Sequence, residues 1–164
     1  MNGILIGRFQ PFHLGHLDAL HFALSKVDKL WIGLGSSNKP LEKKNPFSAE
    51  ERKKMILDSL DNKTNTKIQI FFVPDFDDHG KWANHIDSLV PKFDIVFTND
   101  EMTKHIYTKR KISVFSIPFT KREVLSGTNI RDLIIMDKPW EQLVPEGTRK
   151  FLKQINAKQR LKNL

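Results

Sequence analysis

Short apolar runs alternate with amphipathic segments along the whole chain. The runs are rich in Ile, Val, Leu and Phe, and the first two end at glycine, which is typical of buried strands. They predict strands at 3–7, 29–35, 67–73, 93–98 and 112–117. Apolar residues at helical spacing predict helices at 14–27, 48–60, 82–90, 99–107 and 126–136, and a final helix from Pro145 to Leu164.

This alternation of strands and helices predicts an α/β fold. Strands separated by about 10 to 15 residues of helical pattern form βαβ units, and right-handed crossovers then give a doubly wound, Rossmann-like parallel sheet with helices on both faces. Ligands in such sheets bind beyond the carboxyl ends of the strands. At that edge we expect the polar loops after Gly7, Gly35, Val73 and Thr98. No repeat or linker interrupts the pattern, so we expect a single nucleotide-binding type of domain over 1–164, with 145–164 as its C-terminal helix.

Several of the predicted helices carry local signals. Ser48, with Glu51 three residues later, is a capping-box pattern, and Ser126 or Thr128 is placed to cap the helix at 126–136. Thr98 and Asn99 can cap the helix that follows them. The first helix places five residues on one face: Leu17, Leu20, His21, Leu24 and Val27.

The composition narrows the chemistry. The chain has no cysteine, which excludes disulfides, thiolate metal sites and a cysteine nucleophile. No apolar run approaches the roughly 18 residues of a membrane span, and the first residues lack a signal-peptide pattern, so we expect a cytoplasmic protein without a membrane partner. Lysine and arginine total 27 against 19 acidic residues, a net charge of +8. Such a charge attracts polyanions, either a nucleic acid or a phosphorylated metabolite, although the basic segment 149–164 can also be a solvated helix face.

His13 and His16 stand three residues apart at the start of the first helix, directly after the first strand. Hydrogen-bonded packing is one explanation of such a pair. A metal site is another, but the chain offers no further ligand cluster at zinc-protease spacing. The third is a phosphate site, because a helix start offers free N–H groups and the positive end of the helix dipole. Gly7 would allow a tight turn, Gly15 a close approach, and Arg8 would add a permanent cation.

Two motifs resemble those of a known superfamily. The segment GRFQPFHLGH, at 7–16, resembles the HxGH signature of nucleotidyltransferases, and LSGTNIR, at 125–131, resembles their SGTxIR signature. The arginine-containing first motif is most similar to the archaeal type of nicotinamide-nucleotide adenylyltransferase. The resemblance extends to NPFSAEER at 45–52, KWANHI at 81–86 and the C-terminal segment 144–164. It implies an enzyme that joins nicotinamide mononucleotide (NMN) to ATP, with magnesium accompanying the ATP, and releases NAD and pyrophosphate.

The same resemblance implies roles for individual residues. The expected catalytic residues are His13, His16, Arg131 and Arg8. The expected ATP-binding residues are Gly7, Arg8, Phe9, His13, His16, Lys44, Ser126, Gly127, Thr128 and Arg131. On the acceptor side, Trp82 is expected to stack on the nicotinamide ring and Asp75 to bind a ribose hydroxyl or the carboxamide, with Asp77 and Asp78 as alternatives. The segment 118–125, including Phe119, is expected to wall the adenine. The resemblance implies no metal ligand in the protein itself.

The chain departs from the family pattern in the loop before the second helix. The family has an arginine where this chain has Lys44, which keeps the charge and loses the bidentate fork, and Lys43 is close enough in sequence to substitute. Arg52 is either a phosphate ligand or a structural helix residue, and we expect the structural role.

The chemistry of the implied reaction fits the residue types present. The acceptor 5′-phosphate is already largely ionised near neutral pH, since its second pKa is about 6, so attack on the α-phosphorus of ATP needs no general base. It needs cations and N–H donors for the phosphates. Alternative acceptors are nicotinic acid mononucleotide, FMN and phosphopantetheine, and CTP with a small phosphate ester is a further variant. A non-catalytic nucleic-acid-binding module is the alternative from another class, supported by the net charge and the basic segment 149–164. Resemblance to hexameric relatives implies a homo-oligomer such as a hexamer.

Overall fold

A computed structural model describes residues 1–118 and 120–164. The described residues form a five-stranded sheet in the order β3-β2-β1-β4-β5, and every pairing is parallel. The strands are β1 (Asn2–Gly7), β2 (Lys29–Leu34), β3 (Ile68–Phe72), β4 (Ile95–Phe97) and β5 (Ser113–Phe115). The predicted parallel, doubly wound sheet is confirmed, with each strand inside its predicted range to within one residue.

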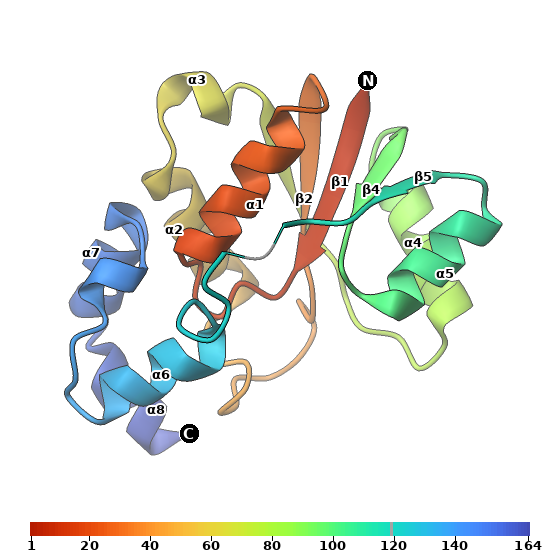
Figure 1. The fold of residues 1–164 in the computed structure, drawn as a ribbon. Helices are drawn as coiled ribbons and strands as arrows, with labels where there is room; N and C mark the ends of the chain where they lie inside the picture. Colours follow the sequence, from red (N-terminus) through yellow and green to blue (C-terminus); the bar gives the residue numbers. More distant parts are fainter. Residues whose placement is uncertain (119) are drawn as a thin grey trace.

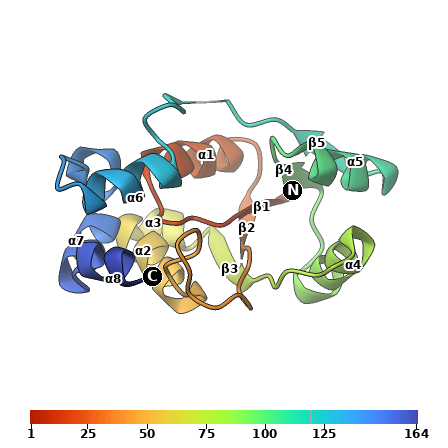
Figure 2. The same ribbon diagram turned by 90° about the horizontal axis from the view of Figure 1, so that it is seen from below.

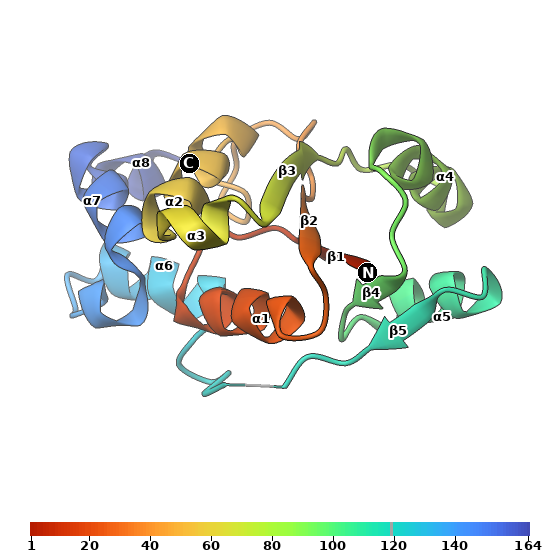
Figure 3. The same ribbon diagram turned by 90° about the horizontal axis from the view of Figure 1, so that it is seen from above.

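Helices cover both faces of this sheet and give three layers (Figures 1, 2 and 3). The helices are α1 (Leu14–Leu24), α2 (Ala49–Ser59), α3 (Asn62–Asn65), α4 (His79–Leu89), α5 (Glu101–Lys109), α6 (Gly127–Ile135), α7 (Glu146–Gln154) and α8 (Ala157–Asn163), with a short 3-10 turn at Glu141–Leu143. In all three views α1 and α2 lie on one side of the strands, together with α6, α7 and α8, while α4 and α5 lie on the other side.

Alternation along the strands divides the core in the same way. On one face Leu5 pairs in register with Ile32 and Phe97, and all three are buried in the cluster that includes α1, α2 and α6. On the opposite face Ile4 and Trp31 are buried with the apolar residues of α4. Both faces of the sheet are thus apolar, as a parallel sheet covered by helices requires.

The topology places a switch point at the carboxyl end of β1. From β1 the chain steps outward to β2 and β3, and α4 then carries it back to β4, on the other side of β1. The loops meet at this edge: the Gly35 N–H donates to the Gly7 carbonyl (2.8 Å), and the Ser37 N–H donates to the Val73 carbonyl (3.1 Å). The predicted gathering of these loops at one sheet edge is confirmed, and it is where ligands bind in such folds.

Two predicted caps are confirmed and one is corrected. Ser48 and Glu51 form a full capping box, and Ser126, rather than Thr128, caps α6 by accepting the Asn129 N–H (3.1 Å). The cap of α5 is Asp100, because its carboxylate accepts the Thr103 N–H (2.9 Å) and the chain is still extended at this residue.

Three sequence predictions about helices are wrong in detail. The last helix is two helices, because Asn156 adopts the left-handed conformation (φ 52°) between α7 and α8. Helix α4 begins at His79, earlier than predicted, because Asp78 caps it by accepting two backbone N–H groups. His21 is exposed on α1, where the neighbouring Ala23 takes the buried position.

Among the described helices, none has the length and apolar character that crossing a bilayer would require.

Candidate active site

His13 and His16 form a reciprocal pair at the start of α1. The His16 N–H donates to Nδ1 of His13 (3.3 Å), and the His13 N–H donates to Nδ1 of His16 (3.2 Å). Their rings are stacked with centroids 3.6 Å apart. The pair is therefore a capping box built from two imidazoles, and it fills the role that Ser and Glu have at α2.

This geometry sets the protonation of both rings. Each Nδ1 accepts a hydrogen bond and so carries no proton, which leaves Nε2–H as the donor of each neutral ring. Burial lowers the pKa of His13 to about 4, and burial, followed by the charge of His13, lowers the pKa of His16 well below its usual value. Near neutral pH the pair presents uncharged N–H donors.

The start of α6 faces the start of α1. Arg131 donates from Nη1 to the Gln10 carbonyl (2.7 Å) in the β1–α1 loop, and its Nη2 lies 3.4 Å from Oγ1 of Thr128. Gly127 is required by this approach, because a Cβ there would lie 2.8 Å from the Gln10 carbonyl oxygen. Burial, followed by the charge of Arg8, lowers the pKa of Arg131. The two motifs, 110 residues apart in the chain, are thus joined directly.

A basic cavity lies between these two helix starts. A smaller part, of about 210 Å³, is lined by Arg8, Phe9, Gln10, His16, Lys44, Gly127, Thr128 and Arg131. A larger adjoining part, of about 720 Å³, is lined by Arg8, Lys43, Lys44, Thr128, Arg131, Asp132, Ile135, Leu161 and Lys162. We call the two together the phosphate cavity. The charges and the helix start suit a chain of phosphates.

A second cavity opens beyond β1, β2 and β3. It has a volume of about 600 Å³, and its walls include Arg8, Ser36, Lys39, Asp75, Phe76, His79, Trp82, Asp100 and Met102. After the role that the resemblance implies for Trp82 and Asp75, we call it the acceptor cavity. Arg8, an exposed residue directly after β1, borders both cavities. A ligand in either cavity can therefore reach the same guanidinium.

The three candidate aspartates differ in position. Asp75 lines the acceptor cavity, and its carboxylate accepts a hydrogen bond from Oγ of Ser36 (2.8 Å). Asp78 is committed to capping α4. Asp77 is exposed and does not line the cavity. Asp75 is thus the one of the three that shares the cavity with Trp82.

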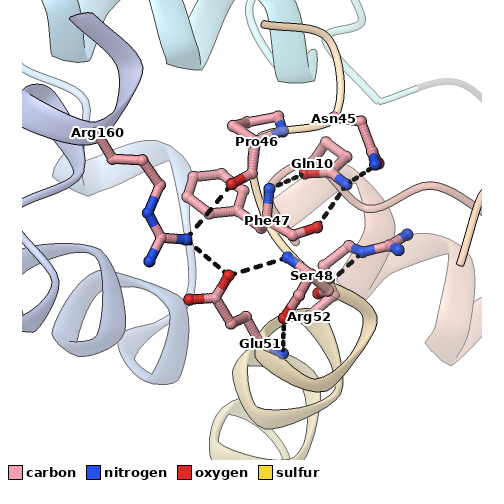
Figure 4. Close-up of polar contacts among 8 residues, drawn as sticks. All are labelled: Gln10, Asn45, Pro46, Phe47, Ser48, Glu51, Arg52 and Arg160. Atoms are coloured by element: carbon pink, nitrogen blue, oxygen red, sulfur yellow. Dashed lines mark hydrogen bonds and ion pairs between the residues drawn. The ribbon is translucent and has the colours of Figure 1, made fainter. Parts of the chain in front are cut away.

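A buried glutamine holds the loop before α2, and sequence reasoning missed it (Figure 4). Nε2 of Gln10 donates to Oδ1 of Asn45 and to the Phe47 carbonyl (2.9 Å), and its Oε1 accepts the Phe47 N–H (3.0 Å). From the other side, Arg160 of α8 forms an ion pair with Glu51 (2.6 Å). The segment that carries Lys43 and Lys44 is thus anchored at its end.

Arg52 is structural, as expected. It is almost fully buried, and its Nη1 donates to the carbonyls of Arg8 (2.8 Å) and Gly35 (2.7 Å) while Nε donates to the Ser48 carbonyl (3.2 Å). Burial, followed by the charge of Arg8, lowers its pKa to about 10. Its Nη1 fixes the loops after β1 and β2 relative to each other.

Comparison with known proteins gives the family. A cytidylyltransferase-like family model matches residues 4–133. A nicotinamide-nucleotide adenylyltransferase from Thermococcus sibiricus is 38% identical over 166 aligned positions, which cover 100% of this chain and 89% of that relative. The enzyme of the same name from Thermoplasma acidophilum is 37% identical over 160 positions, covering 98% and 89%. The chain belongs to the nicotinamide-nucleotide adenylyltransferase family.

The fold of this family member is also found in a solved structure. It matches a bifunctional NMN adenylyltransferase/ADP ribose pyrophosphatase from Francisella tularensis, complexed with AMP and a Mn ion, with a TM-score of 0.86 and 25% identity. The match covers 99% of this chain and 51% of that protein, so the chain spans about half the length of the bifunctional enzyme.

The remaining family positions fall as follows. Phe9 borders the smaller part of the phosphate cavity, but its ring is buried and packs edge-on against His16, with centroids 4.7 Å apart. The tight turn expected at Gly7 is made by Phe9 itself, which has φ 51°. Lys43 and Lys44 both line the larger part. Phe119, expected near the adenine, lies outside the described residues.

Proposed function

We propose that this chain transfers AMP from ATP to NMN, giving NAD and pyrophosphate. Membership of the adenylyltransferase family supports the reaction. The structural observation that carries it is the position of Arg8 between a basic cavity at two helix starts and a second cavity with Trp82 and Asp75. A donor triphosphate and an acceptor phosphate placed in these cavities meet at one cation.

The reaction is a direct in-line displacement. An oxygen of the NMN 5′-phosphate attacks the α-phosphorus, the bond between the α-phosphorus and the bridging oxygen breaks, and the electron pair leaves with pyrophosphate. Because the attacking phosphate is already ionised, the enzyme holds the two anions together and stabilises the charge that moves to the leaving group.

The two imidazoles act at the α-phosphate. His16 borders the smaller part of the phosphate cavity, and its Nε2–H, together with that of His13, donates to oxygens that gain charge in the transition state. The mutual caps at Nδ1 fix both donors before ATP binds. Neutral donors on a rigid helix start cost little reorganisation during the reaction.

The leaving pyrophosphate is held at α6. Arg131, Thr128, Lys44 and Arg8 line both parts of the phosphate cavity, and the N–H groups after Ser126 point from the helix start. Magnesium enters as the metal of MgATP and neutralises phosphate oxygens when bound. The lining of the cavity is mostly cationic and includes the carboxylate of Asp132, so the ion would be held chiefly by phosphate oxygens of the nucleotide.

NMN occupies the acceptor cavity. The Trp82 face attracts the cationic pyridinium ring, and the Asp75 carboxylate accepts a hydrogen bond from the carboxamide or a ribose hydroxyl. The same carboxylate repels the extra negative charge of nicotinic acid mononucleotide.

We also propose that the enzyme works in the cytoplasm, where its nucleotide substrates occur. We propose further that it is a homo-oligomer such as a hexamer, and sedimentation velocity would measure this state.

A substrate panel tests the proposal. Purified protein is given ATP and magnesium with NMN, nicotinic acid mononucleotide, FMN or phosphopantetheine, and pyrophosphate release is followed. We expect the highest kcat/KM with NMN and the formation of NAD. Turnover with FMN or phosphopantetheine alone would overturn the assignment, as would salt-sensitive DNA binding without any ATP turnover.

A further inference from the structure

Helix α8 returns to the active site after a break in the chain. Asn156 adopts the left-handed conformation, so α8 turns away from α7 and packs beside α6. In Figures 1 and 2 its end lies close to the loop between β2 and α2. Residues near position 160 thereby come next to cations from the first third of the chain.

The orientation of α8 is fixed on several sides. Ala157 and Leu161 are buried in the core, with 3% and 4% of their surfaces exposed. Lys158 forms an ion pair with Asp137 after α6, and Arg160 forms one with Glu51 of α2 (2.6 Å). With these contacts made, the helix cannot rotate freely about its axis.

This orientation places Lys162 in the wall of the phosphate cavity. Lys162 lines the larger part and does not line the smaller part, where His16 lies. Four other cations line the same part: Lys43, Lys44, Arg8 and Arg131. The lining also includes the carboxylate of Asp132. Among the described residues, no ion pair engages Lys162.

We infer that Lys162 is a substrate-binding residue of the adenylyltransferase reaction, whose ammonium group contacts the terminal phosphates of ATP and then the released pyrophosphate. This assignment rests on the proposed function, because it places the α-phosphate beside His16 and the other phosphates in the larger part of the cavity. A cation there stabilises the charge that develops on the leaving group. Helix α8 then has a direct part in the site besides anchoring the loop through Arg160.

Ligands that differ in their phosphates test the assignment. Binding of ATP, pyrophosphate and AMP is measured by calorimetry for the wild type, Lys162→Gln, Lys162→Arg and the control Lys153→Gln. Lys153 is an exposed lysine of α7, so the control loses the same charge away from both cavities. For Lys162→Gln we expect Kd to rise about 3- to 10-fold for ATP and pyrophosphate and to stay constant for AMP. Lys162→Arg should retain most of the affinity.

Other outcomes separate this assignment from the proposed function. An equal loss of AMP affinity, or the same losses in Lys153→Gln, would overturn the role of Lys162. Wild-type protein that binds pyrophosphate through Lys162 without converting NMN would refute the proposed function and support the site. Wild-type protein that binds neither ATP nor pyrophosphate would refute both.

Discussion

His13 and His16 cap each other: each backbone N–H donates to Nδ1 of the other ring, and the rings stack at 3.6 Å. The groups that start helix α1 are therefore the same groups that face the α-phosphate in the proposed reaction. Protonation of either Nδ1 would remove a cap acceptor and place a charge beside a buried ring. In the proposed reaction, stability and catalysis are therefore coupled through this pair.

The first prediction concerns pH and stability. The pKa of His13 is about 4 in the folded state against an ordinary 6.5, so the unfolded state binds more protons below pH 6.5. The stability that the neutral His13 ring contributes is fully present above pH 6.5 and is lost as the pH drops toward 4. Between pH 7.5 and pH 5 we expect the wild type to lose about 2 kcal/mol from this group. Urea denaturation at several pH values measures it.

His13→Asn is the matched variant. Asn keeps an acceptor for the cap and does not titrate, so its stability should fall less over the same pH range. If plots of the free energy of unfolding against pH run parallel for the wild type and His13→Asn, the assigned protonation state is contradicted.

The second prediction separates capping from catalysis at His16. In His16→Asn the side-chain Oδ1 can still accept the His13 N–H, but the Nε2–H donor is lost. We expect kcat to fall about 100- to 1000-fold, with the KM for NMN within about 2-fold and the melting temperature nearly unchanged. His16→Ala should lose similar activity and also stability. Equal changes in kcat and in NMN binding would deny the residue a transition-state role.

Local spacing made much of this architecture predictable. The Ser48–Glu51 box depends on residues three apart, and the doubly wound parallel sheet follows from right-handed crossovers between apolar runs, whereas the order of its strands comes from the structure. The resemblance implied that the two signature motifs lie close together, and the hydrogen bond from Arg131 to the Gln10 carbonyl is the contact that joins them. The roles of the site residues in catalysis stay predictions.

The parts that could not be predicted depend on distant or unusual contacts. Gln10 finds its partners 35 and 37 residues away, and no local pattern marks it. Histidine is not a usual helix cap, so the reciprocal pair had no sequence rule behind it. The break at Asn156 lies in an unbroken helical pattern that has no Gly or Pro between Thr148 and Leu164, so only the tolerance of Asn for the left-handed conformation gives a hint.

The third prediction tests Gln10 as a positioning residue. Gln10→Glu removes the donor to Asn45 and Phe47, so the segment before α2 should detach from the β1–α1 loop. We expect the KM for ATP to rise about 5- to 20-fold, because Lys43 and Lys44 are no longer held at the phosphate cavity. Trypsin cleavage after Lys43 and Lys44 should accelerate by a similar factor.

Gln69→Glu provides the control for this change. Gln69 is exposed on β3, so the same chemical substitution is made away from the site. If Gln10→Glu and Gln69→Glu have the same ATP KM and the same cleavage rate, Gln10 does not position the loop.

The fourth prediction concerns Trp82 and the charge of the acceptor ring. Trp82 lines the acceptor cavity and also packs partly against the core beside α4. Trp82→Leu preserves apolar packing and removes the aromatic face, so the KM for NMN should rise about 5- to 30-fold with the KM for ATP unchanged. The KM for NMN of Trp82→Phe should lie between those of the wild type and Trp82→Leu.

The reduced mononucleotide, whose ring carries no charge, separates stacking on a cation from simple contact. The wild type should prefer NMN over this reduced form, and Trp82→Leu should lose most of that preference. If the preference survives in Trp82→Leu, the pyridinium charge is recognised by another group, and Asp75, whose carboxylate lines the same cavity, is then the next residue to test.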